Sequence, residues 1–220
     1  MVTRASNAVV VDPEVDLTLL GPLGCGIQTG SGTVLNRLKP VIGESIVVFG
    51  CGAVGLSAIM AAKLTGCSQI IAVDIHASRL ALAGELGATH QINGKEQDAV
   101  ALIKQITGKG AHYAVETTGV SAIVLQAVHA VKPLGTVAIV GFTGDITFNV
   151  QNDLMAEGKS LVGVIEGDAV PALFIPLLVQ QYKQGKFPID KLIVRYPLAD
   201  INQAFADSAS GKVIKPVVVM

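Results

Sequence analysis

The stretch IVVFGCGAVG, residues 46–55, joins a short apolar run to a glycine-rich turn and the start of a helical pattern. Its β-branched residues predict a buried strand, and Gly50, Gly52 and Gly55 follow in the spacing G-x-G-x-x-G. In this context the first glycine permits a tight turn, the second lets a phosphate approach the backbone, and the third brings helix and strand close. The stretch therefore predicts a phosphate-binding turn.

The helix after this turn supports the same interpretation. Val54 is the first residue of the helix predicted after the turn and Ala53 directly precedes it, and the first backbone N–H groups of a helix lack partners within it. Because these groups and the positive end of the helix dipole favour a bound pyrophosphate, the dinucleotide site is expected at Gly50, Gly52, Ala53, Val54 and Gly55. Two alternatives stay open: a turn that only packs tightly, and the glycine-rich turn of a methyltransferase that binds S-adenosylmethionine.

A carboxylate at the end of the next apolar run, IIAVD, strengthens the dinucleotide interpretation. Asp74 follows Gly50 at about the spacing that dinucleotide-binding folds show. A carboxylate there accepts hydrogen bonds from the adenosine ribose and repels a 2′-phosphate, which favours NAD over NADP. Arg79, five residues on, can support a phosphate, but we interpret it as lying beside the adenine and ribose.

The remaining sequence alternates short β-rich runs with helical ones, which indicates right-handed crossovers and a parallel sheet. The predicted fold class is α/β, a doubly wound parallel sheet of the Rossmann type with short lead-in and tail segments. We expect a lead-in at 1–40, the NAD-binding domain at 41–187 and a tail at 188–220. The lead-in is expected to contain a short strand, a turn and a loop before a helix. Strands are predicted at 45–49, 69–73, 113–117, 136–140 and 161–165, and helices at 54–65, 78–86, 99–107 and 123–131.

Composition excludes several classes of protein. The 220 residues are 50% hydrophobic and 15% charged, with a net charge of -1, so neither nucleic acid nor an anionic membrane is an expected partner. Residues 46–62 are uncharged and approach the length of a membrane span, but their glycines favour strand, turn and helix. Three cysteines without a C-x-x-C motif, and a start that lacks a signal peptide, predict a reducing, cytoplasmic compartment.

Two further strand ends are expected to line the cofactor crevice, because ligands of open parallel sheets bind beyond the carboxyl ends of the strands. Thr117 lies in VETTG, residues 115–119, and the second strand end is VGF. Each supplies backbone groups for the nicotinamide side, and ordinary strand-to-helix turns are the alternative. The residues of the second strand end are Val140, Gly141 and Phe142.

The segment GPLGCGIQTGSG, residues 21–32, and the segment that begins with VFGCGAVG resemble the medium-chain zinc-dependent alcohol dehydrogenases. The first is most similar to the aryl- (benzyl-) alcohol dehydrogenase branch, and the resemblance extends to the closing SGKVIKPVVV. It implies that Cys25 is a catalytic zinc ligand and that Thr29 flanks the nicotinamide. A helix N-terminus stabilises the thiolate that zinc binds. The alternative is a small packing residue, as expected for Cys51 and Cys67.

The same resemblance implies roles at the cofactor. Asp74 and Arg79 match contacts to the adenosine ribose, and Lys215 matches a basic residue that reaches the phosphates. Val140 and Phe142 match positions whose backbone holds the carboxamide. The implied reaction is hydride transfer between NAD and a primary, aryl alcohol, with zinc as the Lewis acid and the aldehyde as product.

The chain departs from this family in its zinc ligands. A catalytic zinc needs three protein ligands, and the resemblance places the other two in an N-terminal domain that this chain does not contain. None of the histidines has metal-ligand spacing with Cys25, so surface or helix-packing roles are expected for His76, His90, His112 and His129. We therefore expect a C-terminal portion that binds NAD with little or no turnover.

Quaternary structure and two alternative functions complete the expectations. The resemblance implies a homodimer in which the edge strand predicted at 161–165 pairs with its two-fold mate. The chain is alternatively an NAD(H)-binding module without chemistry of its own, as the missing zinc ligands suggest. A zinc-independent reductase of the same superfamily is the third interpretation, and Cys25 argues against it.

Overall fold

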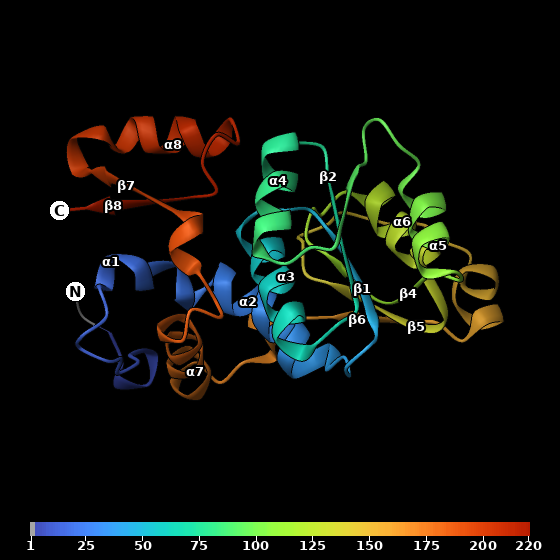
Figure 1. The fold of residues 1–220 in the computed structure, drawn as a ribbon, viewed down its shortest axis with the longest axis horizontal. Helices are drawn as coiled ribbons and strands as arrows, with labels where there is room; N and C mark the ends of the chain where they lie inside the picture. The colour runs from blue at the N-terminus through green and yellow to red at the C-terminus, as the bar shows by residue number, and fades with distance from the viewer. Residues whose placement is uncertain (1–2) are drawn as a thin grey trace.

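The computed structural model describes residues 3–220 and contains a six-stranded parallel sheet with helices on both faces (Figure 1). The strand order is β3-β2-β1-β4-β5-β6, so the order reverses beside β1, as in doubly wound nucleotide-binding folds. The predicted fold class is confirmed. The strands are β1 Ser45–Phe49, β2 Gln69–Asp74, β3 His90–Asn93, β4 Ala111–Glu116, β5 Val131–Ile139 and β6 Ser160–Gly163.

Four helices connect the strands of this sheet. Helix α3 begins at the glycine turn after β1, and its C-cap Gly66 adopts a left-handed conformation that ends it. Helix α5 begins where the side chain of Asp98 accepts a hydrogen bond from the backbone N–H of Ala101. The helices are α3 Ala53–Thr65, α4 Ala77–Leu86, α5 Ala99–Thr107 and α6 Ser121–Ala130.

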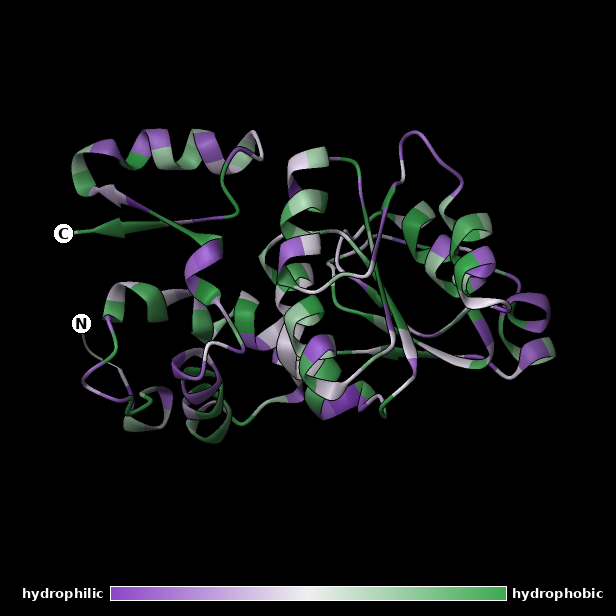
Figure 2. Ribbon diagram, in the orientation of Figure 1, coloured by the Kyte–Doolittle hydropathy of each residue, from purple (hydrophilic) through white to green (hydrophobic). Residues whose placement is uncertain are grey.

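The central strand β1 is buried along its whole length, because helices cover both faces of the sheet. Alternate residues enter two separate cores: Ile46 and Val48 pack with α3 and α4, whereas Val47 and Phe49 pack with α5 and α6. Figure 2 shows the strands mostly in hydrophobic colours and the turn after β3 as hydrophilic. The near-continuous apolar runs of the sequence therefore reflect burial on two sides.

A second, smaller unit contains both ends of the chain and lies beside α3 and α4 (Figure 1). Two parallel strands form its own sheet, with Ile193 opposite Lys215. Helix α2 continues in a wider helical turn over Thr33–Leu38 and ends at Lys39, whose φ of 51° is left-handed. The elements are α1 Leu17–Leu20, α2 Gly26–Gly32, α7 Pro171–Lys183, β7 Ile193–Pro197, α8 Ile201–Ala209 and β8 Lys215–Val219.

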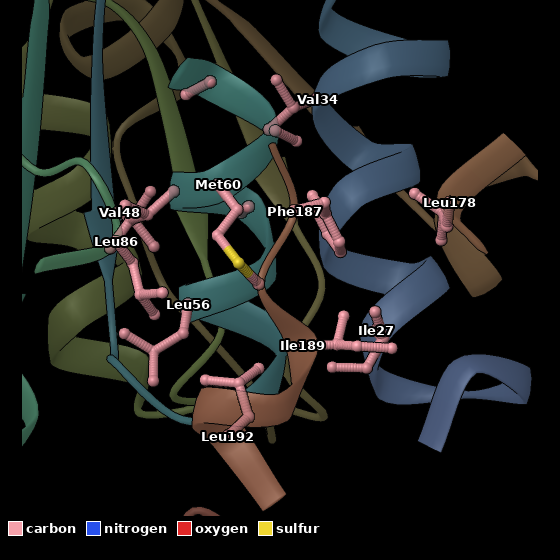
Figure 3. Close-up of a cluster of buried hydrophobic side chains, with 14 of the residues drawn as sticks. Ile27, Val34, Val48, Leu56, Met60, Leu86, Leu178, Phe187, Ile189 and Leu192 are labelled. Carbon is pink, nitrogen blue, oxygen red and sulfur yellow. The ribbon is translucent and has the colours of Figure 1, made fainter. Parts of the chain in front are cut away.

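Close packing of α2 on α3 joins the two units. A Cβ on Gly30 would overlap the backbone carbonyl of Val54, so only glycine permits this approach. The chain after α7 runs between the two helices, where Phe187 and Ile189 are almost fully buried (Figure 3). This packing places the N-terminus of α2 beside the glycine turn.

The structure corrects two expectations about secondary structure. The strand expected in the lead-in is absent from the described residues there, where short helical turns replace it. Val9 and Val11 pack against the core from one side and have no strand to pair with. Strand β3 was not predicted, because its four residues, HQIN, lack a β-branched pattern.

The uncharged residues 46–62 form most of β1, the glycine turn and most of α3. No helix within residues 3–220 combines the length and the apolar character that a membrane span requires.

Candidate functional site

A cleft of about 710 Å³ lies at the carboxyl ends of β1, β2 and β4, where the strand order reverses. Nine of the residues proposed from the sequence line it, although they come from segments up to 190 positions apart. These are Cys25, Gly50, Gly52, Ala53, Val54, Asp74, Arg79, Thr117 and Lys215.

The glycine turn at the centre of the cleft has the geometry that its spacing predicts. Gly50 adopts a φ of 90°, which side-chain-bearing residues rarely do. A Cβ on Gly55 would overlap the carbonyl oxygen of Gly50, so this glycine lets α3 start close to β1. A Cβ on Gly52 would meet no atom within 4 Å and would extend into the cleft. The space beside Gly52 is therefore open within the cleft.

Asp74 fixes the turn to the end of β2. Its side chain is only 8% exposed, and its oxygens accept the backbone N–H groups of Cys51 at 2.6 Å and His76 at 2.9 Å. The N–H of Ile75 donates to the same carboxylate at 2.8 Å. A carboxylate has about four acceptor positions, so one remains for a ribose hydroxyl. The residue thus has a structural role that the sequence interpretation did not include.

Two basic residues reach the cleft from different elements. Arg79 lies in the first turn of α4, and its guanidinium group lies against Gly211 in the turn before β8. Its Nε atom is buried and has no hydrogen-bond partner among the described residues. Lys215 is the first residue of β8 and lines the cleft. Both positive charges are therefore placed where an anionic ligand would lie.

Cys25 is the N-cap of α2, exposed at one end of the cleft. Thr29 is buried one turn later, where its hydroxyl donates to the carbonyl of Cys25 at 2.9 Å, and it does not line the cleft. The other two cysteines differ, because burial raises the pKa of the Cys51 thiol and of the Cys67 thiol. Cys25 is thus the cysteine with access to a ligand.

Strand β4 ends in a turn organised by a residue that the sequence interpretation missed. Glu116 is fully buried, and its carboxylate accepts the N–H of Thr118 at 2.7 Å and the hydroxyl of the same residue. The N–H of Gly119 also donates to it, at 3.2 Å. The hydroxyl of Thr117 donates to the carbonyl of Phe49, at 2.9 Å. A carboxylate followed within three residues by threonine and glycine is a signal that identifies such a turn.

The strand end VGF contributes less to the cleft than the sequence suggested. The N–H groups of Val140 and Gly141 donate to the backbone carbonyl of Glu116, at 2.9 Å and 3.1 Å. The Phe142 side chain is fully exposed, and none of these three residues lines the cleft. A contact of their remaining backbone groups with a nicotinamide stays a prediction.

The described residues do not form a complete metal site. No group of three His, Cys, Asp or Glu side chains within residues 3–220 is close enough together to hold an ion. His112 and His129 interact with Ser45 and Asp153 respectively. His76 is exposed and lines the cleft as the N-cap of α4. Cys25 is therefore a single candidate ligand.

Comparison with known proteins gives matches over nearly the whole chain. The model of the zinc-binding dehydrogenase family matches residues 53–180. Geraniol dehydrogenase of Castellaniella defragrans is 42% identical over 221 residues, which cover 99% of this chain and 59% of that protein. Alcohol dehydrogenase 1 of Pisum sativum is 33% identical over 224 residues, which cover 100% of this chain and 59% of that protein.

Solved structures agree with this result. Benzyl alcohol dehydrogenase of Acinetobacter calcoaceticus is 51% identical with a TM-score of 0.95, and the match covers 98% of this chain and 60% of that one. An alcohol dehydrogenase zinc-binding domain protein of Burkholderia ambifaria is 52% identical with a TM-score of 0.96, covering 99% and 59%. The chain thus spans about three fifths of the length of the proteins that it matches.

Proposed function

The chain belongs to the zinc-binding dehydrogenase family, and from this premise we propose that its cleft binds NAD(H) for an alcohol dehydrogenase reaction. The single observation that carries the proposal is the open space beside Gly52, bordered by the carboxylate of Asp74. A pyrophosphate needs close access to backbone N–H groups, and an adenosine ribose needs an acceptor nearby. The cleft offers both within one β-α-β unit.

The residues of the cleft have distinct proposed roles. The first N–H groups of α3, at Ala53 and Val54, hold the pyrophosphate at the positive end of the helix dipole. Arg79 and Lys215 add positive charge beside it. Asp74 accepts a ribose hydroxyl with the acceptor position that its three backbone bonds leave free. NAD, when bound, supplies the hydride chemistry, and the protein orients it.

We prefer NAD to NADP because of the charge at position 74. A 2′-phosphate would lie against a carboxylate whose two oxygens are fixed by backbone donors and cannot rotate away. Arg79 is on the same side and would attract a phosphate, but its guanidinium group is packed against Gly211. The fixed carboxylate of Asp74 therefore favours a cofactor with a free 2′-hydroxyl over one with a 2′-phosphate, since the Arg79 guanidinium group is already packed against Gly211.

For a protein of the relatives' full length we propose oxidation of a primary alcohol whose carbon is activated by an adjacent π-system. The similar proteins named for benzyl alcohol and geraniol support this class of substrate, and the aryl alcohol is the member expected from the sequence. Cys25 is proposed as one of three zinc ligands in a protein of the relatives' full length. Because the described residues contain no group of three potential ligands, the site would need ligands from outside residues 3–220 to hold a zinc ion.

Assembly and location are part of the proposal. Strand β6 pairs with β5 on one side and lies at the edge of the sheet, which is the arrangement that a two-fold strand pairing requires. We propose a homodimer through this edge and a cytoplasmic enzyme. A non-catalytic NAD(H)-binding module remains the second candidate, supported by the incomplete ligand set. The exposure of Cys25 in the cleft argues against a zinc-independent reductase.

Isothermal titration calorimetry of the purified chain with NADH tests the proposal. We expect saturable binding that a Gly52→Ala substitution weakens about tenfold or more, because the new methyl group occupies the space for the pyrophosphate. Gly144→Ala is the matched control, since a Cβ there also meets no atom within 4 Å but lies outside the cleft. Absence of NADH binding to the folded wild-type chain would show that the proposal is wrong.

A further inference from the structure

Three consecutive residues after β6 have left-handed backbone conformations. Glu166, Gly167 and Asp168 have φ values of 49°, 69° and 48°. Such conformations are costly for residues with a side chain and persist where surrounding contacts determine them. The segment, which we call the EGD turn, is therefore a constrained part of the structure.

Contacts from α2 and its continuation hold the EGD turn in place. Gly167 packs so closely on α2 that a Cβ on Gly32 would overlap its carbonyl oxygen. The side-chain amide of Asn36 donates to that same carbonyl at 3.0 Å. Arg37 forms an ion pair with Asp168 at 3.4 Å. The conformation of the EGD turn is thus specified by residues more than 130 positions earlier in the chain.

The result of this arrangement is a carboxylate fixed over the first turn of α2. Oε2 of Glu166 lies 3.0 Å from Nε2 of Gln28 and 3.3 Å from the hydroxyl oxygen of Thr29. Gln28 is only 3% exposed, and its amide also donates to the carbonyl of Gly24 at 3.2 Å. Both amide hydrogens are therefore used, which fixes the direction of the bond to Glu166.

This carboxylate does not line the cleft, but it borders the end opposite Asp74 through the hydroxyl of Thr29, which also contacts the carbonyl of the cleft residue Cys25. Asp74 ends β2, on one side of the strand-order reversal, whereas Glu166 follows β6, on the other side. A dinucleotide lies across that reversal, so a cofactor with its adenosine at Asp74 has its nicotinamide toward Cys25, Gly26 and Thr117. The Glu166 side chain contacts the helix that begins at this end of the cleft.

We propose that Glu166 is a positioning residue whose charge makes the site prefer the oxidised form of the cofactor; the inference rests on the proposed function. The nicotinamide ring of NAD⁺ is positively charged and that of NADH is neutral. A fixed negative charge near the ring therefore stabilises bound NAD⁺ relative to bound NADH. Glu166 also holds Thr29 and Gln28 in the first turn of α2, which affects both forms of the cofactor equally.

Calorimetric titration of the full chain with NAD⁺ and NADH separately tests this inference. Glu166→Gln keeps an acceptor for Gln28 and removes the negative charge. The ratio of the Kd for NAD⁺ to the Kd for NADH should then rise about threefold, because the solvent-screened attraction between one carboxylate and the positive ring is lost. Glu166→Asp retains the charge and should keep the ratio within about twofold of wild type. Asp190→Asn, at an exposed acidic residue outside the cleft and the EGD turn, is the matched control and should leave the ratio unchanged.

Failure of the proposed function and failure of the role of Glu166 give different results in these titrations. If the wild-type chain is folded and binds neither cofactor, the proposed function fails. If both cofactors bind and Glu166→Gln weakens them by the same factor, Glu166 is only a structural residue and the inference is overturned. The same holds if Asp190→Asn moves the ratio as much as Glu166→Gln does, because a general effect of surface charge would then explain the change.

Discussion

The two halves of the cleft are built in different ways. The half proposed for the adenosine consists of β1, α3, β2 and the start of α4, so Gly50, Asp74 and Arg79 lie within 30 residues of one another. The half proposed for the nicotinamide begins at Cys25 and is bordered by Thr29 and by Glu166, which is more than 130 residues away. The first half is a local supersecondary structure, whereas the second depends on packing between the two units.

This difference separates the parts of the site that form with the sheet from those that need other segments. In the adenosine half, one carboxylate both closes the glycine turn and offers an acceptor to the ligand. In the nicotinamide half, Cys25 is exposed, and no group of three potential metal ligands is present among the described residues. The following substitutions test whether the halves respond independently.

Gly55→Ala should have the largest effect. The new methyl group would overlap the carbonyl of Gly50 and press on Val48, so we expect the free energy of unfolding to fall by about 3 kcal/mol or more. Urea denaturation followed by circular dichroism measures this. Gly52→Ala is the control and should change stability by less than about 0.5 kcal/mol, because its Cβ meets no atom within 4 Å. Equal stability of the two variants would contradict the role assigned to Gly55.

Asp74→Ala should affect both stability and cofactor choice. It leaves three backbone N–H groups without their acceptor, one of them on the buried Cys51, and should cost about 2 kcal/mol in urea denaturation. It also removes the charge that repels a 2′-phosphate, so the preference for NADH over NADPH should decrease in calorimetric titrations. Unchanged stability together with an unchanged preference would contradict the geometry described for this carboxylate.

Gly32→Ala tests the nicotinamide half alone. The methyl group would displace the EGD turn, at a cost of about 1–2 kcal/mol of stability in urea denaturation. The ratio of NAD⁺ to NADH dissociation constants should shift in the same direction as for Glu166→Gln. Affinity for ADP-ribose, which lacks the nicotinamide, should stay the same. A loss of ADP-ribose binding equal to the loss of NAD⁺ binding would show that the halves are coupled.

Asp207→Asn should have the smallest effect and concerns the unit that carries Lys215. The Asp207 carboxylate accepts hydrogen bonds from Tyr196 at 2.7 Å, Gln203 at 2.8 Å and Lys212 at 3.0 Å. The bond from Tyr196, followed by that from Lys212, lowers the pKa of Asp207 below its ordinary value of 3.8. A lowered carboxyl pKa stabilises the folded state above the ordinary value, and this is lost as the pH falls through the lowered one.

The wild-type chain should therefore be more stable than Asp207→Asn at neutral pH, and the difference should shrink below pH about 4. Urea denaturation at a series of pH values measures the difference, and other carboxyl groups cancel because both proteins contain them. A difference that stays constant down to acidic pH would mean that the carboxylate charge has no role in holding α8 to β7 and β8.

Prediction from the sequence was most successful for elements whose bounds are fixed by residues within one short segment. The strand predicted at 45–49 and the helix at 99–107 have the bounds that the structure shows, because burial on both sides and a strong cap define them locally. The strand His90–Asn93 was missed, because its pairing with β2 and not its composition makes it a strand. The strand expected in the lead-in was a wrong prediction. The described apolar residues there have no neighbouring strand to pair with, so they do not form a strand.

The amino-acid sequence by itself determined the alternating α/β order, the glycine turn and the position of Asp74, because spacing along one strand, turn and helix fixes them. Only the tertiary structure showed that Asp74 also accepts the backbone N–H of Cys51 and that Glu166 lies over Thr29. These are side-chain hydrogen bonds between segments that are distant in sequence. Their energies depend on packing in three dimensions, which no local pattern of residues encodes.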